Sequence, residues 1–151
     1  MKIILVILLL LTVALCFAEY TDTQKASILT SVQNLTKQMY AGNPAAYAAI
    51  DWTVFNSFGT DIGAQYDTLK TANEKLKLQA GVLVDFKVNL DDLGIEPSKL
   101  SNWEINSETD TYFIINAECN NFLLWFSFSK TGNGYLLYKI EDEDLMDNED
   151  Y

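Results

Sequence analysis

The fold is decided by residues 111–140, which read TYFIINAECNNFLLWFSFSKTGNGYLLYKI. Apolar side chains recur at every second position, and this alternation predicts three β-strands, at residues 111–119, 122–130 and 135–140. The breaks between them, Asn120-Asn121 and residues 131–134, are short enough for hairpins. A weaker strand is expected around Trp103. The C-terminal half of the chain is therefore predicted to form an antiparallel meander.

A further alternating stretch covers residues 75–90, where every second side chain is apolar. This pattern predicts another strand. Fully extended, its 16 residues would span about 53 Å, whereas a globule made of residues 19–151 is about 36 Å across. We therefore expect this strand to bend, with a bulge at Ala80-Gly81.

Helical patterns precede these strands. Thr21 and Gln24 have the spacing of a capping box, and the apolar residues after them recur three and four positions apart until Gly42. A second helix is predicted for residues 43–58, and a short third helix begins after the cap Asp61. Helices followed by a meander predict an α+β domain, with the helices packed on one face of a curved antiparallel sheet.

This layout resembles the nuclear-transport-factor-2-like group within the cystatin-like folds. Paired N-terminal helices, a break, and a long bent strand leading into a meander carry the resemblance over residues 21–141, and residues 43–66 resemble the second helix of that group and the segment after it. The resemblance implies a cone with a pocket between the concave sheet and the helices, used for catalysis, ligand binding or dimer contacts. Enzymes of the group place Asp, His or Tyr in the cone, and this chain departs from them because it has no histidine.

The N-terminus has the pattern of a secretory signal peptide, residues 1–18. Lys2 precedes an apolar run, and the small residues that end the segment place the cleavage before Glu19. The run is shorter than the roughly 20 residues that a membrane-spanning helix needs. We therefore expect a secreted protein, outside the cell or in a lumen of the secretory pathway, with no membrane anchor after cleavage. The remaining chain is expected to form one domain, residues 19–140.

The charge of the exported chain is strongly negative. Nine lysines stand against 21 acidic residues, which gives a net charge of −12, and there is no arginine. This charge repels phosphate backbones, so nucleic acid is not an expected partner. Seven of the acidic residues crowd residues 141–151, which predicts an acidic, disordered tail.

Residue types needed for common catalytic sites are missing. Without histidine the chain has no Ser-His-Asp triad and no histidine zinc site, and its glycines form no phosphate loop. We therefore expect no cofactor and no metal, and a non-enzymatic role rather than catalysis, although a pair of carboxylates could still perform acid–base chemistry. After cleavage Cys119 is the only cysteine, so it is either buried or bridges two chains.

The predicted strands are apolar on both faces. One face is assigned to the core through Phe113, Ile115, Ala117, Phe122, Leu124, Phe126, Phe128, Leu136, Tyr138 and Ile140. The opposite face carries Tyr112, Leu123, Trp125, Tyr135 and Leu137. Helices can cover only one face, so the other is predicted to meet a ligand or a second copy. The candidate ligand or interface residues are Trp52, Phe55, Tyr66, Trp103, Tyr112, Trp125 and Tyr135.

Three functions are compatible with these patterns. The first is a non-enzymatic secreted domain that binds a small apolar ligand or forms a homodimer through an aromatic sheet face. The second is a cofactor-free enzyme that uses pocket carboxylates and tyrosines, which requires a buried carboxylate with a raised pKa. The third is a structural or signalling protein whose acidic tail contacts a basic partner. Asn34, in an Asn-Leu-Thr triplet, is a glycosylation candidate.

Overall fold

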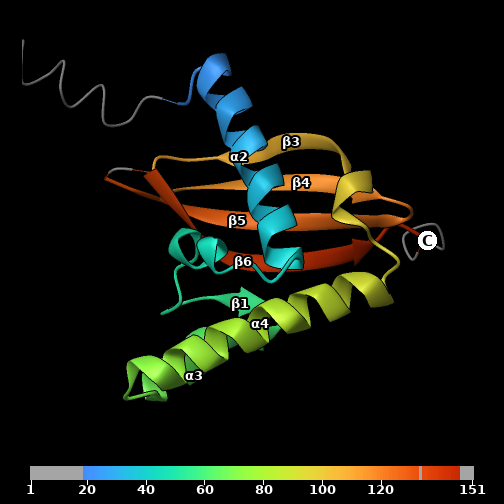
Figure 1. The fold of residues 1–151 in the computed structure, drawn as a ribbon. Coiled ribbons are helices and arrows are strands. Elements are labelled where there is room, and N and C mark those ends of the chain that lie inside the picture. The colour runs from blue at the N-terminus through green and yellow to red at the C-terminus, as the bar shows by residue number, and fades with distance from the viewer. Residues whose placement is uncertain (1–18, 133, 147–151) are drawn as a thin grey trace, which may run out of the picture.

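In the computed structural model, which describes residues 19–132 and 134–146, helices pack on one face of a curved, six-stranded sheet (Figure 1). The predicted α+β class is confirmed. The sheet order is β2-β1-β6-β5-β4-β3. In chain order the elements are α2 (Asp22–Tyr40), the 3₁₀ helix η1 (Pro44–Ala49), β1 (Asn56–Ser57), β2 (Thr60–Asp61), α3 (Ile62–Thr68), α4 (Ala72–Asp92), the 3₁₀ helix η2 (Pro97–Lys99), β3 (Ser101–Glu108), β4 (Tyr112–Cys119), β5 (Phe122–Thr131) and β6 (Gly134–Asp144).

The first helix, α2, forms as predicted. Its capping box is complete, because Gln24 N–H donates to Thr21 Oγ1 at 3.2 Å and Thr21 N–H donates to Gln24 Oε1 at 2.8 Å. The helix ends at the cap Ala41, and Gly42 then adopts a positive φ of 66°, which glycine tolerates without strain. One face of the helix is buried through Ile28, Val32, Leu35, Thr36 and Met39.

The prediction of a bent strand at residues 75–90 is wrong, because these residues lie in the helix α4. A second capping box starts this helix, with Thr71 as the cap and Glu74 at the third helical position. The apolar residues fit a helix as well as a strand, and the helix buries those three or four positions apart: Val82, Leu83, Phe86 and Leu90. A 21-residue helix is about 32 Å long. It therefore fits within the domain, whereas the same residues in one extended strand would be longer than the domain.

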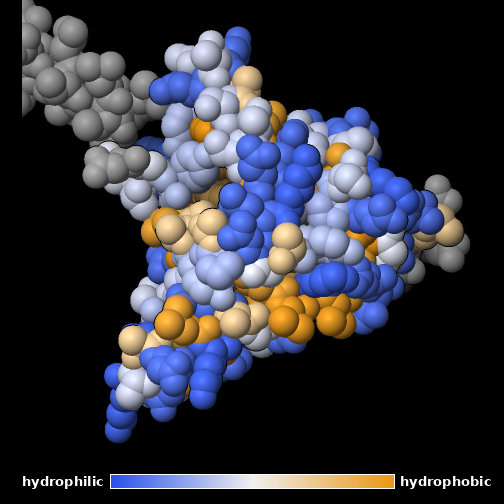
Figure 2. Space-filling model, viewed as in Figure 1, coloured by the Kyte–Doolittle hydropathy of each residue, from blue (hydrophilic) through white to orange (hydrophobic). Residues whose placement is uncertain are grey.

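In a strand, the alternating apolar residues from 76 to 90 would all lie on one face. In α4 they are divided between a buried side and an exposed side of the helix. Leu76, Val84 and Val88 remain about half exposed, and Figure 2 shows hydrophobic surface over α4. Ala80-Gly81, predicted as a bulge, lies inside the helix.

The predicted helix at residues 43–58 is also mostly wrong. Only η1 is helical, and the chain then runs along the edge of β6, where Asp51 N–H donates to the Leu137 carbonyl at 2.9 Å. The β-branched and aromatic residues at 52–55 have low helix propensity, and pairing with β6 satisfies backbone groups nearby. Strand β1 runs parallel to β6, so the sheet is mixed and not purely antiparallel.

The short third helix, α3, forms as predicted after its cap. Asp61 accepts a hydrogen bond from Ala64 N–H at 2.9 Å. A Cβ at Gly63 would lie 2.5 Å from the Thr53 carbonyl oxygen. Glycine at this position therefore allows α3 to approach the segment that precedes β1.

The four predicted strands of the meander are confirmed as β3, β4, β5 and β6. The face assignment was wrong for the start of β6, because a bulge interrupts its pairing with β5. Ser127 is paired with Lys139 and Phe128 with Leu137, so Tyr138 is the extra residue. The bulge places Tyr135 and Leu137 on the side of the helices, where we had placed Leu136 instead.

Strand β6 continues to Asp144, four residues into the segment that we predicted as an acidic tail. These residues pair with the start of β5, Phe122 to Trp125. The last residues of that segment, 147–151, and the predicted signal peptide lie outside the described residues.

Large side chains fill the space between the helices and the sheet. Met39, Phe86, Phe113, Phe126 and Phe128 are at most 1% exposed. This is where the resemblance implies a pocket, and aromatic rings occupy it instead. No helix in the described part of the chain is long and apolar enough to cross a membrane.

Candidate functional site

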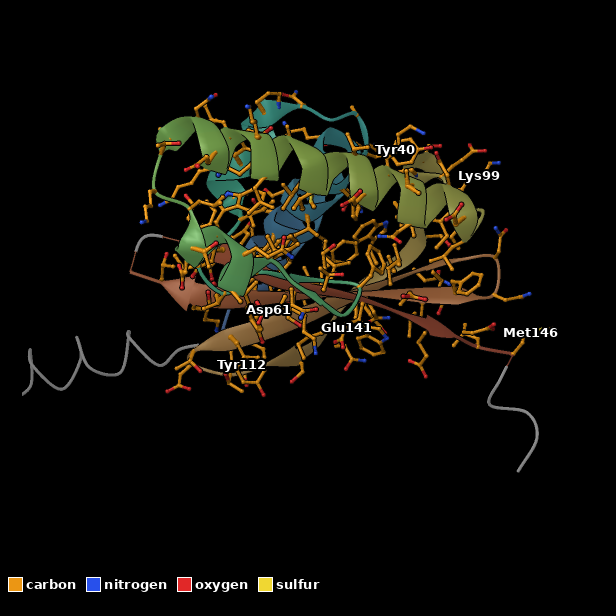
Figure 3. All side chains as sticks on the ribbon, turned by 90° about the horizontal axis from the view of Figure 1, so that it is seen from below. Tyr40, Asp61, Lys99, Tyr112, Glu141 and Met146 are labelled. Atoms are coloured by element: carbon orange, nitrogen blue, oxygen red, sulfur yellow. The ribbon has the colours of Figure 1, made fainter. Side chains whose placement is uncertain are left out.

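The sheet has one face without a helix, which we call the open face. Figure 3 shows α2 and α4 on one side of the sheet and Tyr112 and Glu141 on the other. Strand register defines its members, because they alternate with the buried core positions. They are Ser101, Glu104 and Ser107 on β3, Tyr112, Ile114, Asn116 and Glu118 on β4, Leu123, Trp125, Ser127 and Ser129 on β5, and Leu136, Lys139, Glu141 and Glu143 on β6.

Apolar side chains occupy the middle of the open face. Ile114, Leu123, Trp125 and Leu136 are each half-buried although no described helix covers them. A hydrogen bond orients the Trp125 side chain: its indole Nε1 donates to Glu143 Oε2 at 3.1 Å. The indole is therefore fixed before any partner arrives, and little side-chain entropy remains to be lost on binding.

Acidic side chains dominate the charge of the open face. Its four carboxylates, Glu104, Glu118, Glu141 and Glu143, stand against one ammonium, Lys139, which lies 2.7 Å from Glu141. Glu118 accepts a hydrogen bond from Asn102 Nδ2 at 2.7 Å. Even with these contacts the open face keeps an excess of negative charge.

Asn116 is a buried polar residue on the open face. Only 3% of it is exposed, and its Nδ2 donates to Glu104 Oε1 at 3.2 Å. Its Oδ1 atom is buried and accepts no hydrogen bond within the described residues. An unsatisfied buried carbonyl typically costs about 1–3 kcal/mol, so Asn116 is a locally unfavourable choice for a purely structural position.

The predicted site residues do not form one site. Trp52, Phe55 and Tyr66 cluster where η1, the segment before β1 and α3 meet. Trp52 is buried, with its ring edge-on to Phe55 at 5.7 Å and stacked on Tyr66 at 6.3 Å. Its Nε1 donates to the Tyr47 carbonyl at 2.9 Å. These aromatic residues pack the domain together and present little surface to a ligand.

Trp103 and Tyr135 lie on the helix-covered side. Trp103 stacks on Phe126 with 5.7 Å between ring centres, and Tyr135 packs edge-on against Phe113 and Phe128 at 5.2 and 5.5 Å. Of the seven candidates, Tyr112 and Trp125 are the ones on the open face. Trp125 is paired with Asn116, four residues along β4 from Tyr112, so about 13 Å separates the two aromatic positions along the strand.

The sequence reasoning missed Ile114, Asn116, Glu104 and Glu118 as members of the open face. Their alternation with buried neighbours was visible in the sequence, but the pairing partners were not.

Asn34 and Cys119 lie elsewhere in the fold. Asn34 is exposed on α2, while Thr36 of the same triplet is buried and donates its hydroxyl to the Val32 carbonyl at 2.8 Å. Cys119 is a free, buried cysteine, 5% exposed.

A second charged cluster lies on the covered side, around the buried carboxylate of Glu108. Its Oε1 accepts hydrogen bonds from Lys130 Nζ at 2.8 Å and from Tyr20 N–H at 2.9 Å, and Lys25 Nζ lies 3.7 Å from Oε2. Burial raises the pKa of Glu108, but these bonds and the charges of Lys130 and Lys25 outweigh it and leave the pKa below its ordinary value. The raised pKa that our enzyme hypothesis requires is not found at this buried carboxylate.

No group of three or more Cys, Asp or Glu side chains is arranged to hold a metal ion in the part of the chain that the structure describes. In comparisons with known proteins, no family, curated protein or solved structure matches this chain.

Proposed function

We propose that this chain is an exported, non-enzymatic interaction domain that binds a basic protein through the open face. The observation that carries the proposal is the combination on that face of an apolar centre around Trp125 with four carboxylates and one lysine. No described helix covers these apolar side chains, so packing against the helices does not account for them. Contact with a partner protein would remove them from water.

The size of the open face suits a modest complex. Four neighbouring strands about 4.8 Å apart, each contributing about eight residues, give an area on the order of 500 Å². Two such surfaces in contact would bury about 1,000 Å², which is near the lower limit for a specific protein complex. We therefore expect a transient complex, with Trp125 and Leu123 as its apolar anchors.

The charge of the open face favours a basic partner over a second copy. In a symmetric dimer the carboxylates of both copies would lie near one shared interface, where like charges oppose association. A partner rich in lysine or arginine would meet them with complementary charge, which also accelerates encounter. A homodimer is therefore the competing outcome of the test below.

We also propose that the fold belongs to the nuclear-transport-factor-2-like group. The support is that α2, α3 and α4 precede the meander β3–β6 and that helices pack on one face of the curved sheet. The bent strand at residues 75–90 and most of the helix at residues 43–58, which also carried the resemblance, are not found in the structure. The proposal for the open face depends only on the residues described above and stands without this assignment.

The binding proposal is tested by NMR titration with a 12-residue peptide of alternating lysine and leucine. We expect shifts of the backbone amides of β4 and β5, and an affinity that falls as salt rises from 0.05 to 0.5 M. The double substitution Leu123→Ser, Trp125→Ser should abolish these shifts. Val84→Ser, which removes an exposed apolar side chain from α4, is the matched control and should leave them unchanged.

Analytical ultracentrifugation distinguishes the competing outcome. A dimer that is dissociated by the double substitution would show that a second copy occupies the open face and would overturn the basic partner. Peptide-induced shifts confined to the helices would overturn the open face itself as the binding surface.

A further inference from the structure

A groove separate from the open face lies between α3 and the first half of α4. Its volume is about 560 Å³, within the range of pockets that hold small molecules. It lies among the helical elements of the domain and contains no residue of the open face. The residues that line it are Ala64, Gln65, Thr68, Leu69, Glu74, Lys77 and Leu78.

The floor of the groove is apolar. Leu69 follows α3 and Leu78 lies nearly two turns into α4, and both are half-buried. Leu78 also packs against the hydrophobic core. Ala64 adds a third apolar position on α3. A hydrocarbon chain lying along these side chains would remove apolar surface from water on both sides of the contact.

Lysines are more frequent beside the groove than in the rest of this acidic chain. Residues 70–77 contain three of the nine lysines that follow residue 18 and a single carboxylate, Glu74. Lys70 and Lys77 are exposed and form no ion pair within the described residues. Lys75 lies with its ammonium 4.5 Å from the centre of the Tyr66 ring.

One oxygen of the Glu74 carboxylate is engaged at the start of α4. Its Oε2 accepts hydrogen bonds from Thr71 N–H and Thr71 Oγ1, each at 2.9 Å, and from Lys70 N–H at 3.2 Å. Glu74 keeps its negative charge, and Lys77 is the cationic group of the lining, without an ion pair within the described residues. One free cation beside an apolar floor matches one anion attached to a hydrocarbon chain.

We propose that this groove binds a free long-chain carboxylate, with the hydrocarbon chain along Leu69 and Leu78 and the carboxylate at Lys77. Gln65 and Thr68 lie beside it in the lining. The Thr68 hydroxyl donates to the Gln65 carbonyl at 2.7 Å and the Gln65 amide donates to the Asp61 carbonyl at 3.4 Å, which leaves the second amide hydrogen of Gln65 as a donor. A free amphiphile fits better than a membrane surface, because the net charge of −12 after residue 18 repels anionic bilayers and the groove is a single concave site. This inference is independent of the basic partner of the open face.

The test uses protein purified from cells that express the full chain, and dodecanoate as the probe, below its micelle concentration at neutral pH. Isothermal titration calorimetry gives the affinity, and NMR shifts of the α3 and α4 amides give the location. We expect Lys77→Glu to weaken binding at least tenfold, and decanoate to bind up to about fifteenfold more weakly than dodecanoate because two methylenes are lost. Dodecanol, which lacks the charge, should bind more weakly than dodecanoate.

Two further variants control for trivial effects. Lys37→Glu makes the same charge change at an exposed lysine of α2 and should leave the affinity unchanged. Thr68→Trp, at an exposed position of the lining, should fill the groove and block binding without removing any charge. Circular dichroism of each variant verifies that the fold is retained.

Three results would overturn the proposal. The first is no binding of dodecanoate at millimolar concentration, and the second is equal weakening by Lys77→Glu and Lys37→Glu. The third is binding to phosphatidylcholine vesicles containing dodecanoate without binding to the monomeric probe, which would assign the surface to a membrane. Because none of these variants alters the open face, failure here leaves the peptide titration of that face unaffected.

Discussion

The two faces of the sheet differ in burial although they are built from the same strands. On β4, Phe113 and Ile115 face the helices and are fully buried, whereas Tyr112 and Ile114 face the other way and stay half-buried. Apolar residues on the covered face are needed for the core. Those on the open face contribute less to folding, because no described helix lies on them, and this difference separates residues that stabilise from residues that can bind.

The largest effect is expected on the covered face. Phe126→Ala removes a ring that is 1% exposed and stacked on Trp103, and it should lower the free energy of unfolding by about 3–5 kcal/mol. Urea denaturation followed by circular dichroism measures the change. A loss no greater than that of Trp125→Ala on the open face would break the distinction between the two faces.

A smaller effect is expected for the charged residue on the covered side. Glu108→Gln keeps the shape but removes the charge that faces Lys130 and Lys25, and it should cost about 1–3 kcal/mol. The folded pKa of Glu108 is lowered, so its contribution is complete above the ordinary value near 4.5 and is lost as pH falls through the folded value. The difference in free energy of unfolding between wild type and Glu108→Gln should therefore shrink on acidification below about pH 4.5. A difference that is the same at pH 3 and pH 7 would contradict this account.

Truncation on the open face should affect stability less. Trp125→Ala removes a half-buried ring and its hydrogen bond to Glu143, and we expect a loss of about 1 kcal/mol. Thermal unfolding measures the loss, and the lysine–leucine peptide titration of the same variant measures binding, which should be strongly weakened. Unchanged binding would remove Trp125 from the partner surface.

The smallest change, and one of opposite sign, is expected at the polar residue of the open face. Asn116→Leu removes a buried oxygen that has no hydrogen-bond partner and should stabilise the fold by about 0.5 kcal/mol. Differential scanning calorimetry measures this gain, with Asn106→Leu as the control because Asn106 is an exposed asparagine of β3. Destabilisation by Asn116→Leu would show that the bond from Nδ2 to Glu104 outweighs the unpaired oxygen.

Local patterns were sufficient for the strands at residues 111–140 but not for residues 75–90. In the strands, short polar turns fix where each apolar run ends. Residues 75–90 have no such turns, and their dense apolar content fits both periods equally well. The capping box at Thr71 and Glu74 was the local feature that could have decided for a helix, and the extended length already argued against one straight strand.

The open face was predicted to exist, and its members were predicted only in part. Tyr112 and Trp125 were assigned correctly, because they follow simple alternation within one strand. Tyr135 was misplaced because the bulge at Tyr138 shifts every earlier residue of β6 to the other side. Such a bulge depends on how β5 and β6 pair, which is a tertiary property with no marker in either strand alone.

The outermost strands of the sheet make it hard to extend. One end is β2, only two residues long, and the other is β3, whose pairing with β4 is shifted twice along its length and where Asn102 adopts a φ of 52°. Glu108 adds a charge that points inward at the end of β3. A neighbouring molecule therefore finds no regular row of backbone donors and acceptors to continue, and crowded copies are protected from stacking into a fibril through their edges.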